Sequence, residues 1–272
     1  MILVDHPEWL HPEWLHPGWF RPELGLAALE LGRISGVVAV APIPWTNTPA
    51  RVRVGLVIFL LAAVHGLGDS KVVGIPSAGW AASNIATELI IGLSIGMVVR
   101  LSVAVAEIAG GAIALPMGFS AAQAFDPTLG STDSVLTRLF RNLALLLALI
   151  VGLHRAMLGT LVASFRLLPV GTATHVEATF PIFAELCAHV LAVGVQLALP
   201  VLSVLLMANV ALAFVARAAP TMQIFNVGFA VLLATGAAVL VIFLPDLSRE
   251  LAIDFDKNAR YFERLMFDLA GP

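Results

Sequence analysis

The chain has 272 residues, of which 59% are apolar and 12% are charged, and its mean hydropathy is +0.95. Soluble domains carry about 25% charged residues. This composition therefore argues against a water-soluble globular enzyme, because the chain has too little polar surface to cover its own core. The formal net charge of −3 gives no indication of a nucleic-acid partner. A single cysteine, Cys187, excludes an intramolecular disulfide and a cysteine-based zinc site.

The first 23 residues form a tail that contains a five-residue repeat, which begins at residue 6. His-Pro-Glu-Trp-Leu at 6–10 recurs unchanged at 11–15 and continues in altered form at 16–20. The repeated proline prevents a regular helix, and the segment lacks the basic and apolar regions of a signal peptide. Three of the five tryptophans fall here, and tryptophan favours the membrane–water boundary. We expect a tail that is either disordered after a local duplication, or interfacial and able to bind a partner.

From residue 24 onward, apolar runs alternate with breaks rich in proline, glycine and polar residues. A membrane-spanning helix needs about 20 apolar residues, so hydropathy alone indicates six candidate spans. The runs are 24–41, 52–67, 85–115, 135–168, 182–219 and 222–244. Over 246–272 the pattern changes to apolar and charged residues at helical spacing, which predicts an amphipathic helix. We expect an all-α membrane-associated fold of long helices and helical hairpins, with a helical domain over 24–245.

Several charged residues lie within these apolar segments, where each costs roughly 2.5–3.5 kcal/mol at the centre of a bilayer. The charged residues singled out are Arg33, Glu88, Arg100, Glu107 and Arg217. Arg100 and Glu107 are seven residues apart and so lie on one helix face. Two arrangements remain open, because the charges could pair internally in helical hairpins or pack against other subunits. Gly92 and Gly96 have the spacing of small residues that lets two helices approach closely.

No motif typical of catalysis is present: there is no His-Glu-x-x-His, phosphate-binding glycine loop or Gly-x-Ser-x-Gly. Glu185 and His189 lie one helical turn apart, which favours an intrahelical pair or a partner contact over the alternative of a metal site. His154 and Ser164 would lie about 15 Å apart along one helix, too far for a nucleophile and its base. We therefore expect no enzyme activity, no cofactor and no metal.

The break over 116–133 is long, rich in small residues, and contains Met117, Phe119 and Phe125. A loop at membrane depth must be buried in protein or line a cavity. One interpretation is a mobile loop whose bulky tips close a pore, since hydrophobic constrictions gate by dewetting. The other is an ordinary turn in which both phenylalanines are packing residues. The residues alone leave both open.

Met117-Gly118-Phe119 followed by Phe125-Asp126-Pro127-x-x-Gly130 resembles the FliR/SctT family, the R or T subunits of the bacterial type III protein-export gate. Further stretches resemble the family in the same order along the chain; they are 33–56, 88–96, 164–171, 198–201 and 216–229. The Phe-Asp-Pro sequence resembles the flagellar branch, and the injectisome T subunit is the alternative within the family. The chain departs from the family at 228–232, where the usual proline and lysine are missing, and at 151–154, where the usual Asn-Gly-His is altered.

The resemblance implies a structural and gating subunit of the flagellar type III export channel, in the bacterial inner membrane at the flagellar basal body. It implies the partners FliP and FliQ, with FlhB and FlhA, membrane lipid and unfolded export substrates. The loop would plug the pore through Met117, Gly118, Phe119, Phe125, Asp126, Pro127 and Gly130. Arg33, Glu88, Arg100, Glu107 and Arg217 would meet neighbouring subunits. From another class, a small secondary transporter is the alternative; such proteins often show an inverted repeat, and the pentapeptide is the only repeat found in the sequence.

Overall fold

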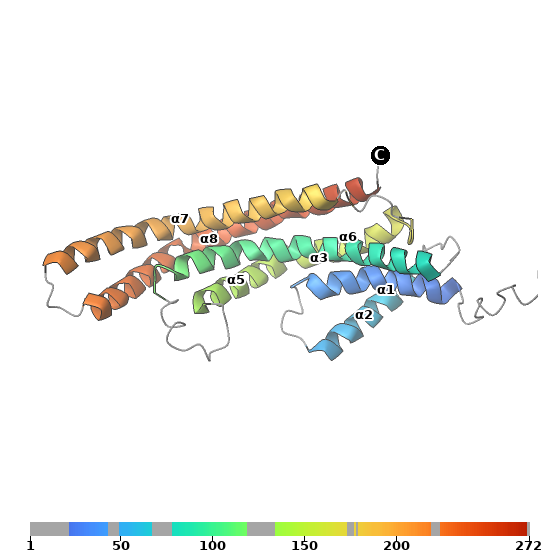
Figure 1. Cartoon of the computed structure of the whole chain (residues 1–272), viewed down its shortest axis with the longest axis horizontal. Helices are drawn as coiled ribbons and strands as arrows, with labels where there is room; N and C mark the ends of the chain where they lie inside the picture. The colour runs from blue at the N-terminus through green and yellow to red at the C-terminus, as the bar shows by residue number, and fades with distance from the viewer. Residues whose placement is uncertain are drawn as a thin grey trace, which may run out of the picture.

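The computed structural model describes residues 22–42, 49–66, 78–118, 134–172, 177, 179–218 and 224–270. In this part of the chain the long elements are all α-helices arranged as an elongated bundle (Figure 1). They are α1 (Pro22–Val40), α2 (Ala50–His65), α3 (Ala78–Ala114), α5 (Val135–Val151), α6 (Leu153–Leu167), α7 (Thr179–Ala218) and α8 (Ile224–Ala270). This confirms the predicted all-α class. The repeat at 6–20 lies outside the described residues.

Helices α1 and α3 run in parallel and approach closely through glycines. A Cβ added to Gly36 would lie 2.5 Å from the carbonyl oxygen of Leu89, and one added to Gly96 would lie 2.9 Å from that of Val37. A Cβ on Gly92 would overlap the carbonyl of Arg33. Only glycine permits this separation, as expected where small residues repeat along a helix. The predicted close approach at Gly92 and Gly96 is confirmed, and its partner is α1.

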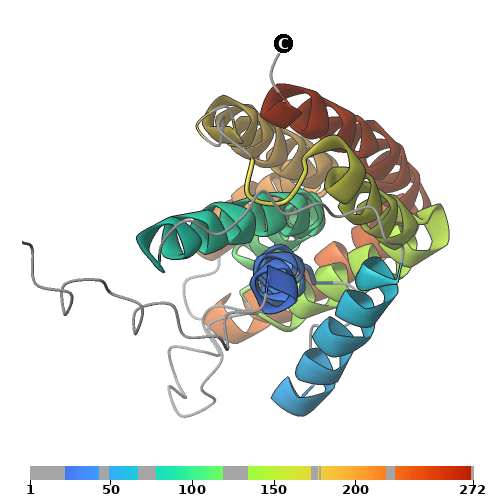
Figure 2. The ribbon, with the colours of Figure 1, turned by 90° about the vertical axis from the view of Figure 1, so that its right-hand side faces the viewer.

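Helix α3 lies at the centre of the bundle and contacts α1, α5, α6, α7 and α8. Its valine and alanine side chains are buried along most of its length, including Val98, Val99, Ala106 and Ala109. Helix α2, by contrast, contacts α1 at the periphery and buries only Val64 (Figure 2). The core therefore forms around α3. The helices that carry the charged groups described below pack against it.

The predicted run 135–168 is two helices and not one. Ser134 caps α5, since its Oγ accepts a hydrogen bond from the Thr137 backbone N–H at 3.0 Å. The helix ends at Gly152, whose φ of +90° places it in the left-handed region that favours glycine. Helix α6 begins directly afterwards, and the pair is bent by 62°. Helix α6 then packs against α8 and α3.

The sixth run and the C-terminal amphipathic segment form one continuous helix, α8, of 47 residues. Pro245 lies inside it, as Pro200 lies inside α7. The expected boundary at residue 246 therefore does not interrupt the helix. It marks the position after which the apolar face of α8 is buried in the bundle. The amphipathic pattern itself is confirmed, because its apolar face is buried in the bundle. The buried residues are Leu247, Leu251, Phe255, Phe262, Leu265, Met266 and Leu269.

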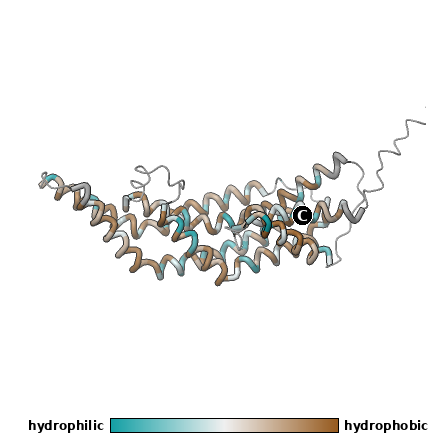
Figure 3. The backbone as a smooth tube through the Cα atoms, turned by 90° about the horizontal axis from the view of Figure 1, so that it is seen from below, coloured by the Kyte–Doolittle hydropathy of each residue, from teal (hydrophilic) through white to brown (hydrophobic). Residues whose placement is uncertain are grey.

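By length and composition, three helices in the described part are long and apolar enough to cross a membrane, or four if α5 and α6 form one bent span. Six candidate spans were expected. Two runs are lost because α2 has only 16 residues and α1 carries Glu23, Glu30 and Arg33 within its 19 residues. The count falls to three if the 62° bend between α5 and α6 breaks their run. Figure 3 shows hydrophobic residues along almost the whole length of the bundle, interrupted by hydrophilic ones.

Candidate functional site

An ion pair between α1 and α3 is completely buried. Arg33 Nε donates to Glu88 Oε2 at 2.6 Å, and both side chains have no exposed surface. The rest of the guanidinium donates to the end of α6, from Nη1 to the Ser164 carbonyl at 2.8 Å and from Nη2 to the Leu168 carbonyl at 3.1 Å. Glu88 Oε1 accepts from the Gly171 backbone N–H at 2.9 Å. The pair therefore ties α1, α3 and the turn after α6 together.

The surroundings of this pair satisfy both charges within the chain. The Ser164 hydroxyl oxygen also accepts from Arg33 Nη1 at 3.1 Å, and the guanidinium lies 4.6 Å from the centre of the Phe165 ring. A buried ion pair is tolerated only when further hydrogen bonds satisfy its remaining donors and acceptors, as they do here. Arg33 and Glu88 were expected at a subunit interface. In this structure they meet each other, because α1 and α3 pack closely enough to enclose both side chains.

The partners from the α6 region were not predicted from the sequence. The atoms involved are mainly backbone atoms of Ser164, Leu168 and Gly171. Almost every residue type carries a backbone carbonyl and N–H, so the sequence cannot show which of them will bond to a charged side chain. Gly171 has a φ of +79°, which is the only indication that this turn needs a glycine. The Ser-Phe…Leu-Pro stretch that resembles the family is the segment that supplies these atoms.

A second charged group joins α3 to α5. Arg100 Nη1 donates to Glu107 Oε1 at 2.8 Å. The seven-residue spacing predicted that the two lie on one helix face, and the structure adds that they bond to each other. Arg141 of α5 donates from Nε to the same oxygen at 2.7 Å. Together with Arg53, Arg100 and Arg141 line a cavity of about 220 Å³ at the end of α1. All three members of the Glu107 group retain some exposure, and their place at a subunit interface stays a prediction.

Polar contacts join the first half of α7 to the second half of α8. His189 Nε2 lies 2.7 Å from Asp254 Oδ1, and Asn258 donates to the other oxygen of Asp254 at 2.9 Å. Glu185 binds Arg264 through two contacts of 3.0 and 3.1 Å. The Glu185–His189 spacing thus marks two separate bonds to α8 and not an intrahelical pair. The described part of the chain holds no group of three or more side chains that could hold a metal ion.

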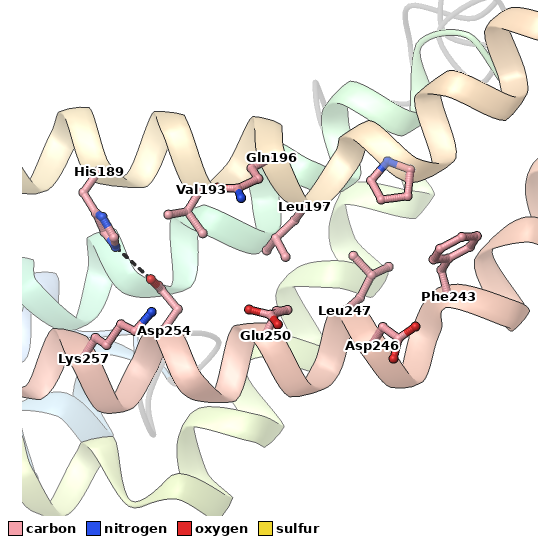
Figure 4. Close-up of a pocket in the computed structure, with 11 residues that line it drawn as sticks. His189, Val193, Gln196, Leu197, Phe243, Asp246, Leu247, Glu250, Asp254 and Lys257 are labelled. Atoms are coloured by element: carbon pink, nitrogen blue, oxygen red, sulfur yellow. Dashed lines mark hydrogen bonds and ion pairs between the residues drawn. The ribbon is translucent and has the colours of Figure 1, made fainter.

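The His189–Asp254 contact borders a cavity of about 300 Å³ between α7 and α8 (Figure 4). Its α7 side includes His189, Val193, Gln196, Leu197 and Pro200, and its α8 side includes Phe243, Asp246, Leu247, Glu250, Asp254 and Lys257. The cavity lies beside Pro200 and just after Pro245. On one side of the cavity the start of α7 and the end of α8 make the polar contacts described above. On its other side the two helices are mainly apolar.

The outer part of this pair, which we call the arm, comprises residues 199–218 of α7 and 224–244 of α8. It lies at the end of the bundle opposite the C-terminus (Figure 1). Its large apolar side chains are widely exposed; they are Leu199, Leu206, Met207, Val210, Phe214, Val215, Val227, Phe229, Val231, Val241, Ile242 and Leu244. Arg217 is exposed near its tip. So many exposed apolar side chains on one part of the molecule indicate contact with lipid or another protein.

The start of the predicted plug loop is fixed against α8. Met117 is only 2% exposed, and a Cβ built on Gly236 would lie 2.5 Å from its Cε atom. Gly118 follows with a φ of +83°. The remaining residues proposed for the plug lie outside the described residues; they are Phe119, Phe125, Asp126, Pro127 and Gly130.

Long apolar helices, internally paired charges and a widely exposed apolar arm define a membrane component built for an assembly. Residues 24–257 match the profile of Bacterial export proteins, family 1. The chain belongs to this family, the FliR/SctT family predicted from its motifs.

Three relatives are each a Flagellar biosynthetic protein FliR. The one from Pectobacterium carotovorum subsp. carotovorum is 32% identical over 219 residues, which cover 78% of this chain and 82% of the relative. The one from Escherichia coli (strain K12) is 31% identical over 225 residues, covering 82% and 85%. The one from Caulobacter vibrioides is 28% identical, covering 82% and 90%. The chain is therefore a membrane component of flagellar protein export.

Proposed function

We propose that this chain is a structural and gating subunit of the flagellar type III export channel, and not an enzyme. It lies in the bacterial inner membrane, packs against FliP and FliQ, and contacts FlhB, FlhA and unfolded export substrates. The observation that carries the proposal is the exposed apolar arm on a chain whose relatives are flagellar biosynthetic proteins.

The distribution of burial supports the assignment of a core and a subunit interface. The most apolar window of α3 is 61% buried within the chain, whereas those of α7 and α8 are only 28% and 11% buried. The Arg33–Glu88 pair between α1 and α3 is satisfied internally. On the arm, Arg217 is exposed among apolar side chains, and a cation in such surroundings is costly in lipid without a partner. We therefore assign the arm to subunit contacts and Arg217 to a carboxylate of a neighbouring subunit.

The plug role rests on where the chain leaves and re-enters the bundle. The end of α3 packs on the start of α5, since a Cβ on Gly110 would lie 3.2 Å from the Leu136 carbonyl. The described chain on either side of 119–133 therefore lies where the end of α3 meets the start of α5. Phe119 and Phe125 would narrow a water-filled passage and close it by dewetting. An export channel needs such a seal because an open passage wide enough for a polypeptide would discharge the membrane.

The plug is tested in cells that express the complete set of export-gate subunits. Residues 119–130 are replaced by a glycine–serine segment of equal length, and the small-ion conductance of the membrane is measured. We expect a large rise in conductance with normal co-purification of FliP and FliQ. A matched control replaces the other residues of the segment but keeps Phe119 and Phe125, and should conduct like the parent. Unchanged conductance in the first variant would rule out the plug.

A further inference from the structure

Three arginines from three different helices line one cavity. They are Arg53 at the start of α2, Arg100 of α3 and Arg141 of α5, and the cavity they share has a volume of about 220 Å³. The rest of its wall is the end of α1 and the two residues that follow, namely Ala39, Val40, Ala41 and Pro42. None of these lining residues, all in the described part of the chain, is acidic. The wall therefore combines three cations with small apolar side chains.

One carboxylate, that of Glu107, binds two of these arginines. It accepts from Arg100 Nη1 and Nη2 at 2.8 and 3.3 Å, and from Arg141 Nε at 2.7 Å. The single negative charge of Glu107 thus stands against three guanidinium cations. A guanidinium presents its N–H donors as a rigid fork that matches the oxygens of a carboxylate or a phosphate. The charge and the donor geometry of this cavity therefore suit an anion.

The helices that carry Arg53 and Arg141 are otherwise apolar on their exposed sides. Helix α2 lies at the outside of the bundle (Figure 2) and packs mainly on α1. A charged side chain among apolar surfaces is costly in lipid without a partner, and basic pockets between membrane helices bind the headgroups of anionic lipids. Such a lipid supplies an anion for the arginines and acyl chains for the exposed side chains. Those side chains are Val52, Val54, Ile58 and Phe59 on α2, and Val135, Leu139 and Leu146 on α5.

We propose that the cavity lined by Arg53, Arg100 and Arg141 binds the phosphate of an anionic phospholipid, whose acyl chains lie along α2 and α5. The volume of about 220 Å³ is sufficient for a phosphate group of five heavy atoms, since a water molecule takes about 30 Å³. The side chains of Arg100 and Arg141 are 40% and 27% exposed, so a headgroup can reach them from outside the chain. The bound phosphate would tie α2 to α3 and α5. Lipid binding here goes beyond the export role proposed above, because it requires only a membrane around the bundle.

The test measures the binding of a fluorescent phosphatidylglycerol to the full-length chain in a neutral detergent, by fluorescence anisotropy. Arg53→Gln and Arg141→Gln should each weaken binding by roughly tenfold or more, because each removes a charged hydrogen-bond donor. Arg155→Gln is the matched control, since Arg155 is exposed on α6 and does not line the cavity; it should bind like the parent. Glu107→Gln should tighten binding by roughly threefold, because it removes the carboxylate that competes for two of the arginines.

Parental affinity in Arg53→Gln would refute the site, and so would weaker binding to Glu107→Gln. Should Arg141→Gln fail to fold, Arg53→Gln decides, because Arg53 lies on the peripheral helix α2.

Two further measurements identify the source of the anion. Inorganic phosphate at constant ionic strength should not displace the lipid; displacement would mean a site for small anions and would overturn the lipid assignment. Co-purification of FliP and FliQ should be unchanged in Arg53→Gln and Arg141→Gln. If both variants lose these partners but bind phosphatidylglycerol like the parent, an acidic side chain of a neighbouring subunit fills the cavity, and the lipid assignment is wrong.

Discussion

The buried Arg33–Glu88 pair gives the sharpest prediction for stability. Glu88→Gln keeps the shape of the side chain and an oxygen for the Gly171 N–H, but removes the negative charge beside a guanidinium with no exposed surface. Removing one member of a buried pair leaves an uncompensated charge and costs about 3–5 kcal/mol. That is roughly two to more than three powers of ten in the unfolding equilibrium. It is also a large part of the 5–15 kcal/mol that typically stabilises a protein.

The assay is equilibrium unfolding by denaturant in detergent micelles, comparing the free energy of unfolding of each variant with that of the parent. Ser164→Ala should cost only about 1 kcal/mol, because the Ser164 carbonyl still accepts from Arg33. Glu185→Gln is the exposed control, since Glu185 and Arg264 are each 52% exposed and solvent screens such pairs. If Glu88→Gln is no less stable than Glu185→Gln, the reasoning from an enclosed charge is wrong.

Three further predictions concern packing and assembly. Gly92→Ala should prevent stable α1–α3 packing, because its Cβ would overlap the Arg33 carbonyl; a loss of protease-resistant protein checks this, with Gly159→Ala resistant as the parent is. Phe140→Ala should lower the free energy of unfolding by about 3–5 kcal/mol, since the ring is buried against Gly110; a denaturant midpoint equal to the parent's would contradict it. Arg217→Ala should reduce co-purification with FliP and FliQ while leaving the unfolding transition unchanged; reduced export from a normally assembled complex would refute the interface assignment.

The sequence was sufficient for features that depend on local pattern. Apolar runs predicted the helices, and the seven-residue spacing predicted that Arg100 and Glu107 lie on one helix face, where the structure joins them. The Gly92–Gly96 spacing predicted a close helix contact, which the structure makes with α1. Hydropathy overestimated the number of membrane spans. It could not show that α1 and α2 do not meet the length and composition of a span, or that the 135–168 run bends at Gly152.

The sequence by itself determined the class of the protein, since a chain this apolar must place its helices in lipid or against other proteins, and its motifs indicated the family. Tertiary structure alone decided which charges meet. Arg33 and Glu88 are distant in sequence, and their remaining hydrogen bonds end on backbone atoms of the α6 region. It also decided that Gly236 receives Met117. The physical reason is that a hydropathy pattern fixes which side of a helix is apolar, whereas a contact depends on which helices lie beside one another.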